Sequence, residues 1–124
     1  LAEDNDLNAE IAAVILERAG LKVERVEDGL QCISRITEMP AGTYDIILMD
    51  IQMPKMDGYK ATQTIRNLSD QEKACIPIIA MTANAFEEDK RAAIAAGMNG
   101  HIAKPIQVDK LLSTLAEMIR QQEN

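Results

Sequence analysis

The sequence is poor in aromatic residues, cysteine and histidine, and these shortages exclude some kinds of site. Its 124 residues include no Trp, two Tyr, one Phe, two Cys and one His. Cys32 and Cys75 lie far apart, with no CxxC motif and no histidine at zinc-site spacing. We therefore expect no zinc centre and interpret both cysteines as reduced packing residues of a cytoplasmic protein.

Long apolar runs and positive charge are also scarce. No run approaches the roughly 20 apolar residues that span a bilayer, and no signal peptide is recognisable, so we predict no membrane insertion by this domain. The net charge of −7 and the pI near 4.7 argue against direct nucleic-acid binding. Because the chain starts at Leu1 and not at Met, we expect it to be a fragment of a longer protein.

What the sequence does contain is typical of one folded domain, which we assign to residues 1–124. Apolar residues make up 47% of it and charged residues 27%, enough for a single core. Strand-like segments at 1–3, 22–26, 44–49, 76–81 and 101–103 alternate with helical patterns. The helices are marked by apolar spacing or by capping residues: Leu7–Ile15, Asp28, Asp57, Asn84 and Val108–Ile119.

Strands separated by helices of this length pair in parallel through right-handed crossovers, and the helices cover both faces of the sheet. The continuous apolar runs DIILM and IPIIAM are typical of strands buried on both faces. The predicted fold is therefore a single doubly wound (βα)5 domain of the α/β class, with a parallel five-stranded sheet.

Polar side chains stand where the predicted strands end, which is where ligands bind in such sheets. The residues are Glu3 and Asp4, then Asp50, Thr82 and Lys104. Individually, an acidic pair can be solvated surface and Thr82 can cap a helix. Asp50 differs, because it ends a buried strand, where an unpaired carboxylate is costly. Together, the strand ends favour a functional site.

The charges of these residues indicate the chemistry. Three clustered carboxylates repel one another unless a cation lies between them, and oxygen ligands suit Mg²⁺. A carboxylate can also attack phosphorus to give an acyl phosphate, for which Asp50 is the candidate. Phosphoryl transfer then requires positioning and positive charge, which Lys104 can supply, while Thr82 can donate a hydrogen bond.

Four motifs in this order resemble the receiver domain of two-component signalling: AEDN (2–5), DIILMDIQMPKMDG (45–58), PIIAMTAN (77–84) and GHIAKP (100–105). The resemblance covers nearly the whole chain. It implies the flavodoxin-like strand order 2-1-3-4-5. It also implies that Asp50 accepts a phosphoryl group from a phosphohistidine of a histidine kinase or a histidine phosphotransfer domain.

The same resemblance implies roles for the other residues. Mg²⁺ would be held by Glu3, Asp4, Asp50 and the main-chain carbonyl of Gln52. Lys104 and Thr82 would contact the phosphoryl oxygens, and a cis bond before Pro105 would aim Lys104.

This chain departs from the family's usual pattern in two ways, at His101 and in the short segment before the acidic pair. His101 occupies a position that often holds Tyr or Phe, and we interpret it as a weak or modified switch residue that acts with Thr82. The alternative is a passive surface residue, and no second His or nearby Cys supports a metal ligand. Only Leu1 and Ala2 precede the acidic pair, so the first strand is expected to be truncated or to start outside this chain.

The residues of the motifs GMNGHIAKPI and MDIQMPKMDGY resemble those of receivers fused to hybrid sensor histidine kinases. A parent protein of this kind can be anchored in the inner membrane. A receiver of a stand-alone response regulator is the alternative. In either case the domain itself would catalyse no turnover beyond its own phosphorylation and dephosphorylation.

Two other classes compete with this interpretation. Phosphatases of the haloacid-dehalogenase type also use a strand-end aspartate, Mg²⁺, Thr and Lys. Their motif is D-x-D, in which the second aspartate acts as general acid, and this chain has Gln52 at that position. A flavodoxin-like flavin binder requires aromatic rings to stack on the flavin, and this chain has few.

Overall fold

Three parallel strands form the centre of the fold, and six helices surround them in the computed structural model, which describes residues 1–51, 53, 55–82, 87–104 and 107–122. The sheet order is β1-β2-β3. The strands are β1 (Ile47–Asp50), β2 (Ile78–Thr82) and β3 (Gly100–Ala103). The helices are α1 (Asp6–Arg18), α2 (Gly29–Glu38), α3 (Gly58–Arg66), α4 (Gln71–Ala74), α5 (Glu87–Ala96) and α6 (Val108–Gln122).

The two N-terminal strands that the sequence predicts are reduced to single bridges in the described part of the chain. Ala2 pairs in parallel with Val26 on one side and with Met49 of β1 on the other. Pairing stays this short because Asn5 already caps α1, so the chain turns away from the sheet after the acidic pair. The order of the five segments is nevertheless the predicted 2-1-3-4-5, and the α/β class with a parallel sheet is confirmed.

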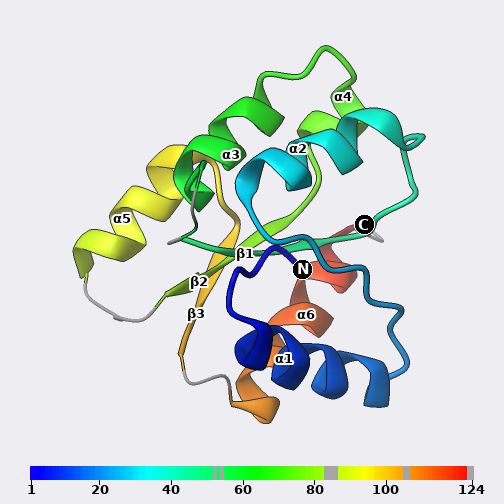
Figure 1. Cartoon of the computed structure of the whole chain (residues 1–124), viewed down its shortest axis with the longest axis vertical. Helices are drawn as coiled ribbons and strands as arrows, with labels where there is room; N and C mark the ends of the chain where they lie inside the picture. Colours follow the sequence, from blue (N-terminus) through cyan, green and yellow to red (C-terminus); the bar gives the residue numbers. More distant parts are fainter. Residues whose placement is uncertain (52, 54, 83–86, 105–106, 123–124) are drawn as a thin grey trace.

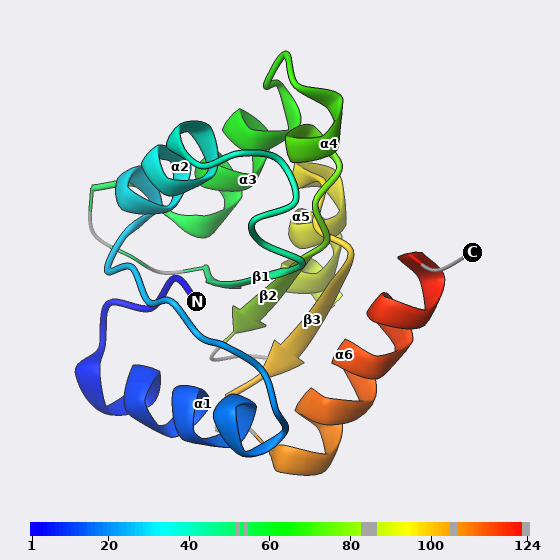
Figure 2. The same cartoon turned by 90° about the vertical axis from the view of Figure 1, so that its right-hand side faces the viewer.

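Helices cover both faces of the sheet, as predicted. In Figures 1 and 2, α1 and α6 lie on one face, and α2, α3 and α5 lie on the other. Successive strand residues point into opposite layers. Towards α2, α3 and α5 the core includes Ile47, Met49, Ile78 and Ala80, and towards α1 and α6 it includes Leu48, Ile79, Met81 and Leu111. β1 and β2 are therefore buried along their whole length.

Capping side chains explain where several helices begin. Asn5, Asp28, Asp57 and Asp70 each accept a hydrogen bond from a main-chain N–H in the first turn of the helix that follows. The predicted caps Asp28 and Asp57 are thus confirmed, whereas Asn84 lies outside the described residues. Asp70 begins α4, a four-residue helix that the sequence did not predict.

Helix α1 forms as predicted, but most of the apolar row that predicted it faces outward. The side chains of Leu7, Ile11 and Val14 are 65%, 46% and 41% exposed. The residues Ala9, Ala12 and Leu16 are buried instead, and they form the inward face of the helix. No helix in the described part of the chain is long and apolar enough to cross a membrane.

Candidate functional site

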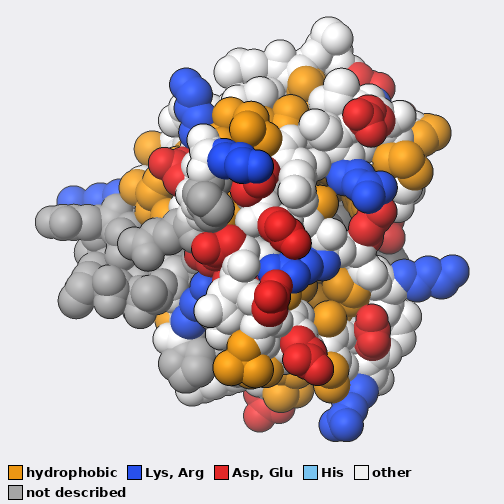
Figure 3. Space-filling view, viewed as in Figure 1, with side chains coloured by type: hydrophobic (Ala, Val, Ile, Leu, Met, Phe, Trp, Pro, Cys, Tyr) orange, Lys and Arg blue, Asp and Glu red, His pale blue; other side chains and the backbone are white. Residues whose placement is uncertain are grey.

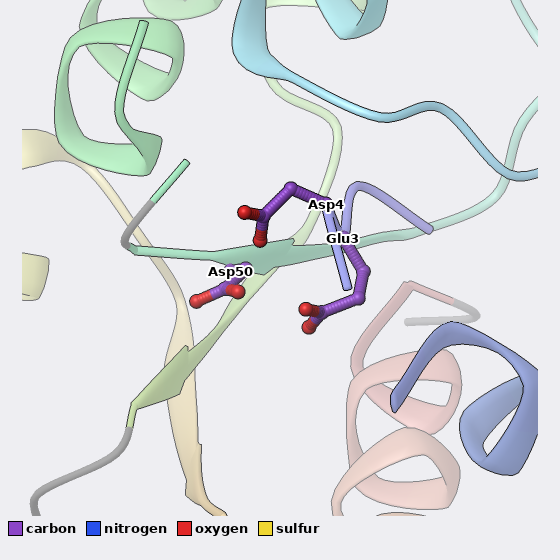
Figure 4. A group of neighbouring side chains, drawn as sticks. All are labelled: Glu3, Asp4 and Asp50. Atoms are coloured by element: carbon purple, nitrogen blue, oxygen red, sulfur yellow. The ribbon is translucent and has the colours of Figure 1, made fainter. Parts of the chain in front are cut away.

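Two segments distant in sequence bring three carboxylates together at the carboxyl end of β1. Glu3 and Asp4 directly follow the bridging residue Ala2, and Asp50 is the last residue of β1. The main chain fixes this arrangement, because the N–H of Asp50 donates to the carbonyl of Ala2 at 2.9 Å. Figure 4 shows the three side chains around the end of the strand.

The three side chains form a compact acidic cluster. One carboxylate oxygen from each of Glu3, Asp4 and Asp50 lies within 4.8 Å of the others. Glu3 is 1% exposed and Asp50 is 4% exposed, whereas Asp4 lies at the surface. The cluster therefore opens to solvent on the Asp4 side, the side from which a ligand can enter.

Lys104, which directly follows β3, pairs with both buried carboxylates. Its Nζ lies 2.8 Å from Asp50 Oδ2 and 2.9 Å from Glu3 Oε2. Burial acts to lower the pKa of Lys104, but the contacts with Asp50 and Glu3 outweigh burial and raise it. Burial raises the pKa of Glu3. The nearby Lys104 ammonium lowers this pKa but only partly offsets the effect of burial. The main chain places the lysine, since its N–H donates to the Thr82 carbonyl at 2.7 Å.

The donor atoms of the cluster fit a hard divalent cation. Oε2 of Glu3 is buried and, in the part of the chain that the structure describes, it accepts no hydrogen bond of good geometry, although the Lys104 ammonium is near. One ammonium also leaves three carboxylates incompletely neutralised. An acidic, oxygen-only site that is open on one side is suited to Mg²⁺, which keeps some of its water ligands.

The remaining predicted site residues are only partly described. Thr82 is buried at the end of β2 and pairs with Ala103 of β3. His101 lies on β3 opposite Ala80, with its side chain exposed. Gln52 and Pro105 lie outside the described residues, so the predicted carbonyl ligand and the cis bond stay predictions.

Comparison with known proteins identifies the family. The family model of the response regulator receiver domain matches residues 1–116. The chain belongs to this family. The match does not favour the haloacid-dehalogenase or flavin-binding alternatives.

Relatives of this receiver domain include parts of histidine kinases. It is 39% identical over 113 residues to the signal transduction histidine-protein kinase BarA of Escherichia coli K12, covering 91% of this chain and 12% of that protein. In eight curated relatives of this kind, the matched segment spans only 5% to 15% of the protein's length.

Two solved structures are also similar. The receiver domain of sensor histidine kinase PA1611 from Pseudomonas aeruginosa PAO1, solved with a magnesium ion coordinated in its active-site cleft, is 37% identical (TM-score 0.85, covering 95% of this chain and 93% of that one). The receiver domain of Saccharomyces cerevisiae Ssk1, crystallised with the histidine phosphotransfer protein Ypd1, is 27% identical (TM-score 0.88, covering 98% and 87%).

Two residues that matter for the geometry of the receiver site were not found by sequence reasoning. Gly58 begins α3 so close to β1 that a Cβ there would lie 2.5 Å from the Asp50 carbonyl oxygen. Arg25 donates two hydrogen bonds to the carbonyl of Glu3. In the sequence, Gly58 only ends the motif DIILMDIQMPKMDG and follows the predicted cap Asp57, so nothing indicated a close approach to β1. No pattern signalled Arg25, since a polar residue in KVERV simply indicates an exposed position.

Proposed function

We propose that this receiver domain accepts a phosphoryl group on Asp50 from a phosphohistidine of a histidine kinase or a histidine phosphotransfer domain, in a Mg²⁺-dependent reaction. The convergence of Glu3, Asp4, Asp50 and Lys104 at one end of the sheet carries the proposal. The solved relative with magnesium in its receiver site supports the choice of cation.

The chemistry follows from how Asp50 is held. A carboxylate oxygen of Asp50 forms a bond to phosphorus while the bond from phosphorus to the imidazole nitrogen breaks, and the imidazole leaves with that electron pair. Bound Mg²⁺ would supply positive charge next to the phosphoryl oxygens. Lys104, already 2.8 Å from Asp50, can move its ammonium onto an incoming phosphoryl oxygen. Strand β1 keeps the nucleophile rigid, because all four of its residues are buried.

The surface next to the site supports a protein as the phosphodonor. Helix α1 begins two residues after Asp4, and its exposed residues Leu7, Ile11 and Val14 recur at helical spacing. Figure 3 shows apolar side chains gathered over the part of the face where Figure 1 places α1. An apolar row of this kind fits a helical partner. The Ssk1 receiver is crystallised with a histidine phosphotransfer protein, which supports a protein partner of that class. We propose that the partner docks on this row.

The direct test is transfer from a phosphorylated histidine phosphotransfer domain. We expect the phosphoryl group to move to this chain when Mg²⁺ is present and to stay on the donor when EDTA replaces it. Phosphate-affinity electrophoresis of both proteins over time measures the transfer. Equal transfer with and without Mg²⁺ would contradict the proposed role of the acidic cluster. Release of inorganic phosphate from a generic phosphomonoester would instead revive the phosphatase interpretation.

We further propose that Thr82 and His101 convert phosphorylation into a change of shape. The Thr82 hydroxyl would follow the phosphoryl oxygens, and the His101 ring would move with it. A hydrogen bond to a charged partner contributes about 1.5–3 kcal/mol. At 1.36 kcal/mol per factor of ten, that shifts a two-state population about tenfold to a hundredfold.

Thr82→Ala is therefore expected to accept phosphate on Asp50 but to lose most of the structural response. Amide NMR with a beryllofluoride phosphoryl mimic measures this response, with Ala103 and Leu111 as reporters. Thr37→Ala, an exposed Thr on α2, is the matched control and should respond like the parent. If Thr82→Ala gives the parent's shift changes, the response does not run through Thr82.

The parent protein belongs to the proposal as well. We propose a hybrid sensor histidine kinase that carries this receiver in the cytoplasm. The histidine kinases among its relatives support this origin, and the free Cys32 and Cys75 are compatible with a reducing compartment.

A further inference from the structure

Arg25 makes a forked contact with the segment that carries the acidic pair. Its Nε and Nη2 donate to the carbonyl oxygen of Glu3 at 3.0 and 2.8 Å. Its Nη1 donates to Oδ1 of Asp6 at 2.8 Å. The Arg25 side chain is 27% exposed. Its two bonds to the Glu3 carbonyl are partly buried, whereas its bond to Asp6 lies at the surface. The three donor nitrogens of one planar guanidinium thus join both ends of the segment from Glu3 to Asp6.

The carbonyl that Arg25 holds belongs to the peptide between Glu3 and Asp4. The orientation of this peptide sets the direction in which each carboxylate leaves the main chain. Glu3 has other restraints, since its N–H donates to Val26 O at 3.1 Å and its Oε1 accepts from the N–H of Asn5 at 3.2 Å. The side chain of Asp4 is exposed, so packing does not place it, and its position depends on the main chain.

We propose that Arg25 is a positioning residue of the metal site. It fixes the Glu3–Asp4 peptide so that both carboxylates face Asp50 before the cation binds. This inference rests on the proposed function, because it takes Glu3, Asp4 and Asp50 as ligands of Mg²⁺. Removing groups that orient metal ligands typically weakens metal affinity about 10- to 100-fold.

A role through charge and a role in positioning predict opposite changes in Mg²⁺ affinity when Arg25 is removed. If Arg25 acted only through its positive charge, it would repel a cation from the cluster, and removing it would tighten Mg²⁺ binding. If Arg25 positions the peptide, removing it loosens the ligands and weakens binding. The sign of the change in Mg²⁺ affinity therefore distinguishes the two roles.

The experiment measures the Kd of Mg²⁺ by isothermal titration calorimetry on the whole chain and its variants, well below the unfolding temperature. Arg25→Gln is expected to raise the Kd about tenfold. Arg25→Lys keeps the charge but loses the fork, and it is expected to raise the Kd by several-fold. Arg35→Gln is the matched control, because Arg35 pairs only with Glu24 at the surface among the ion pairs of the described residues, and it should leave the Kd unchanged.

The outcomes separate this inference from the proposed function. Arg25→Gln with an unchanged or lower Kd overturns the inference while the proposed function stands. A parent protein that binds no Mg²⁺ overturns both. A melting temperature that falls without a change in Kd shows a purely structural role and also overturns the inference. If Arg25→Gln does not fold, Arg25→Lys decides by the same criterion.

Discussion

Replacing Asp50 with Asn is expected to abolish phosphorylation of this receiver domain. An amide oxygen is neither a nucleophile of carboxylate strength nor a good ligand for Mg²⁺, so both the covalent step and the cation site are lost. The fold should persist, because Asn has nearly the shape of Asp and Lys104 keeps its contact with Glu3. Intact-mass spectrometry after incubation with acetyl phosphate and Mg²⁺ measures the adduct, which alkali should remove from the parent.

Asp109→Asn is the matched control for this experiment. Asp109 lies exposed in the first turn of α6 and is not part of the acidic cluster, so its substitution removes the same charge without changing a proposed ligand. This variant should be labelled once, like the parent. Full labelling of Asp50→Asn would show that another residue receives the phosphoryl group.

Replacing Arg66 with Met is expected to lower the free energy of unfolding far more than replacing a surface arginine such as Arg35. The Arg66 guanidinium, at the end of α3, donates to the carbonyl oxygens of Gly97, Ala74 and Ile76 and to Oδ1 of Asn99, at 2.6–2.8 Å. These bonds join four segments at the end of the sheet opposite the site. Each polar group left unsatisfied costs about 1–3 kcal/mol when buried, and partial access to water reduces the cost. We expect a total of about 3 kcal/mol.

Urea unfolding followed by circular dichroism measures this loss. Since domains of this size are stable by about 5–15 kcal/mol, the midpoint should fall markedly. Arg35→Met removes a surface pair with Glu24 and should cost at most about 1 kcal/mol. Equal midpoints for the two variants would show that water replaces the guanidinium of Arg66 without penalty.

The position of the site could be predicted from the sequence because topology determines it. A buried parallel strand that ends in Asp50 must place that carboxylate at the ligand-binding edge, and Lys104 follows another strand to the same edge. The alternation of strands and helices was sufficient for this conclusion. Glu3 and Asp4 reach the same edge if the first segment lies next to β1. The bridge between Ala2 and Met49 places it there.

The features that sequence reasoning missed depend on side-chain contacts without a local pattern. Arg25 contacts a carbonyl 22 residues away, and no spacing rule relates the two positions. The outward row on α1 could not be assigned, since apolar periodicity predicts a helix but does not choose between two apolar faces. Helix α4 is too short to show any periodicity, although its cap, Asp70, is a usual one.

The distances along the chain between the residues of this site affect when it forms. Lys104 and Asp50 are 54 residues apart, and Glu3 is held through a contact 22 residues away. Each such contact closes a long loop, whose entropy cost is repaid only when the surrounding core has formed. A partly folded chain therefore lacks the site, unlike a zinc finger, whose nearby ligands assemble with the metal itself. If this domain binds a cation as proposed, that binding will report the completion of folding and will not nucleate it.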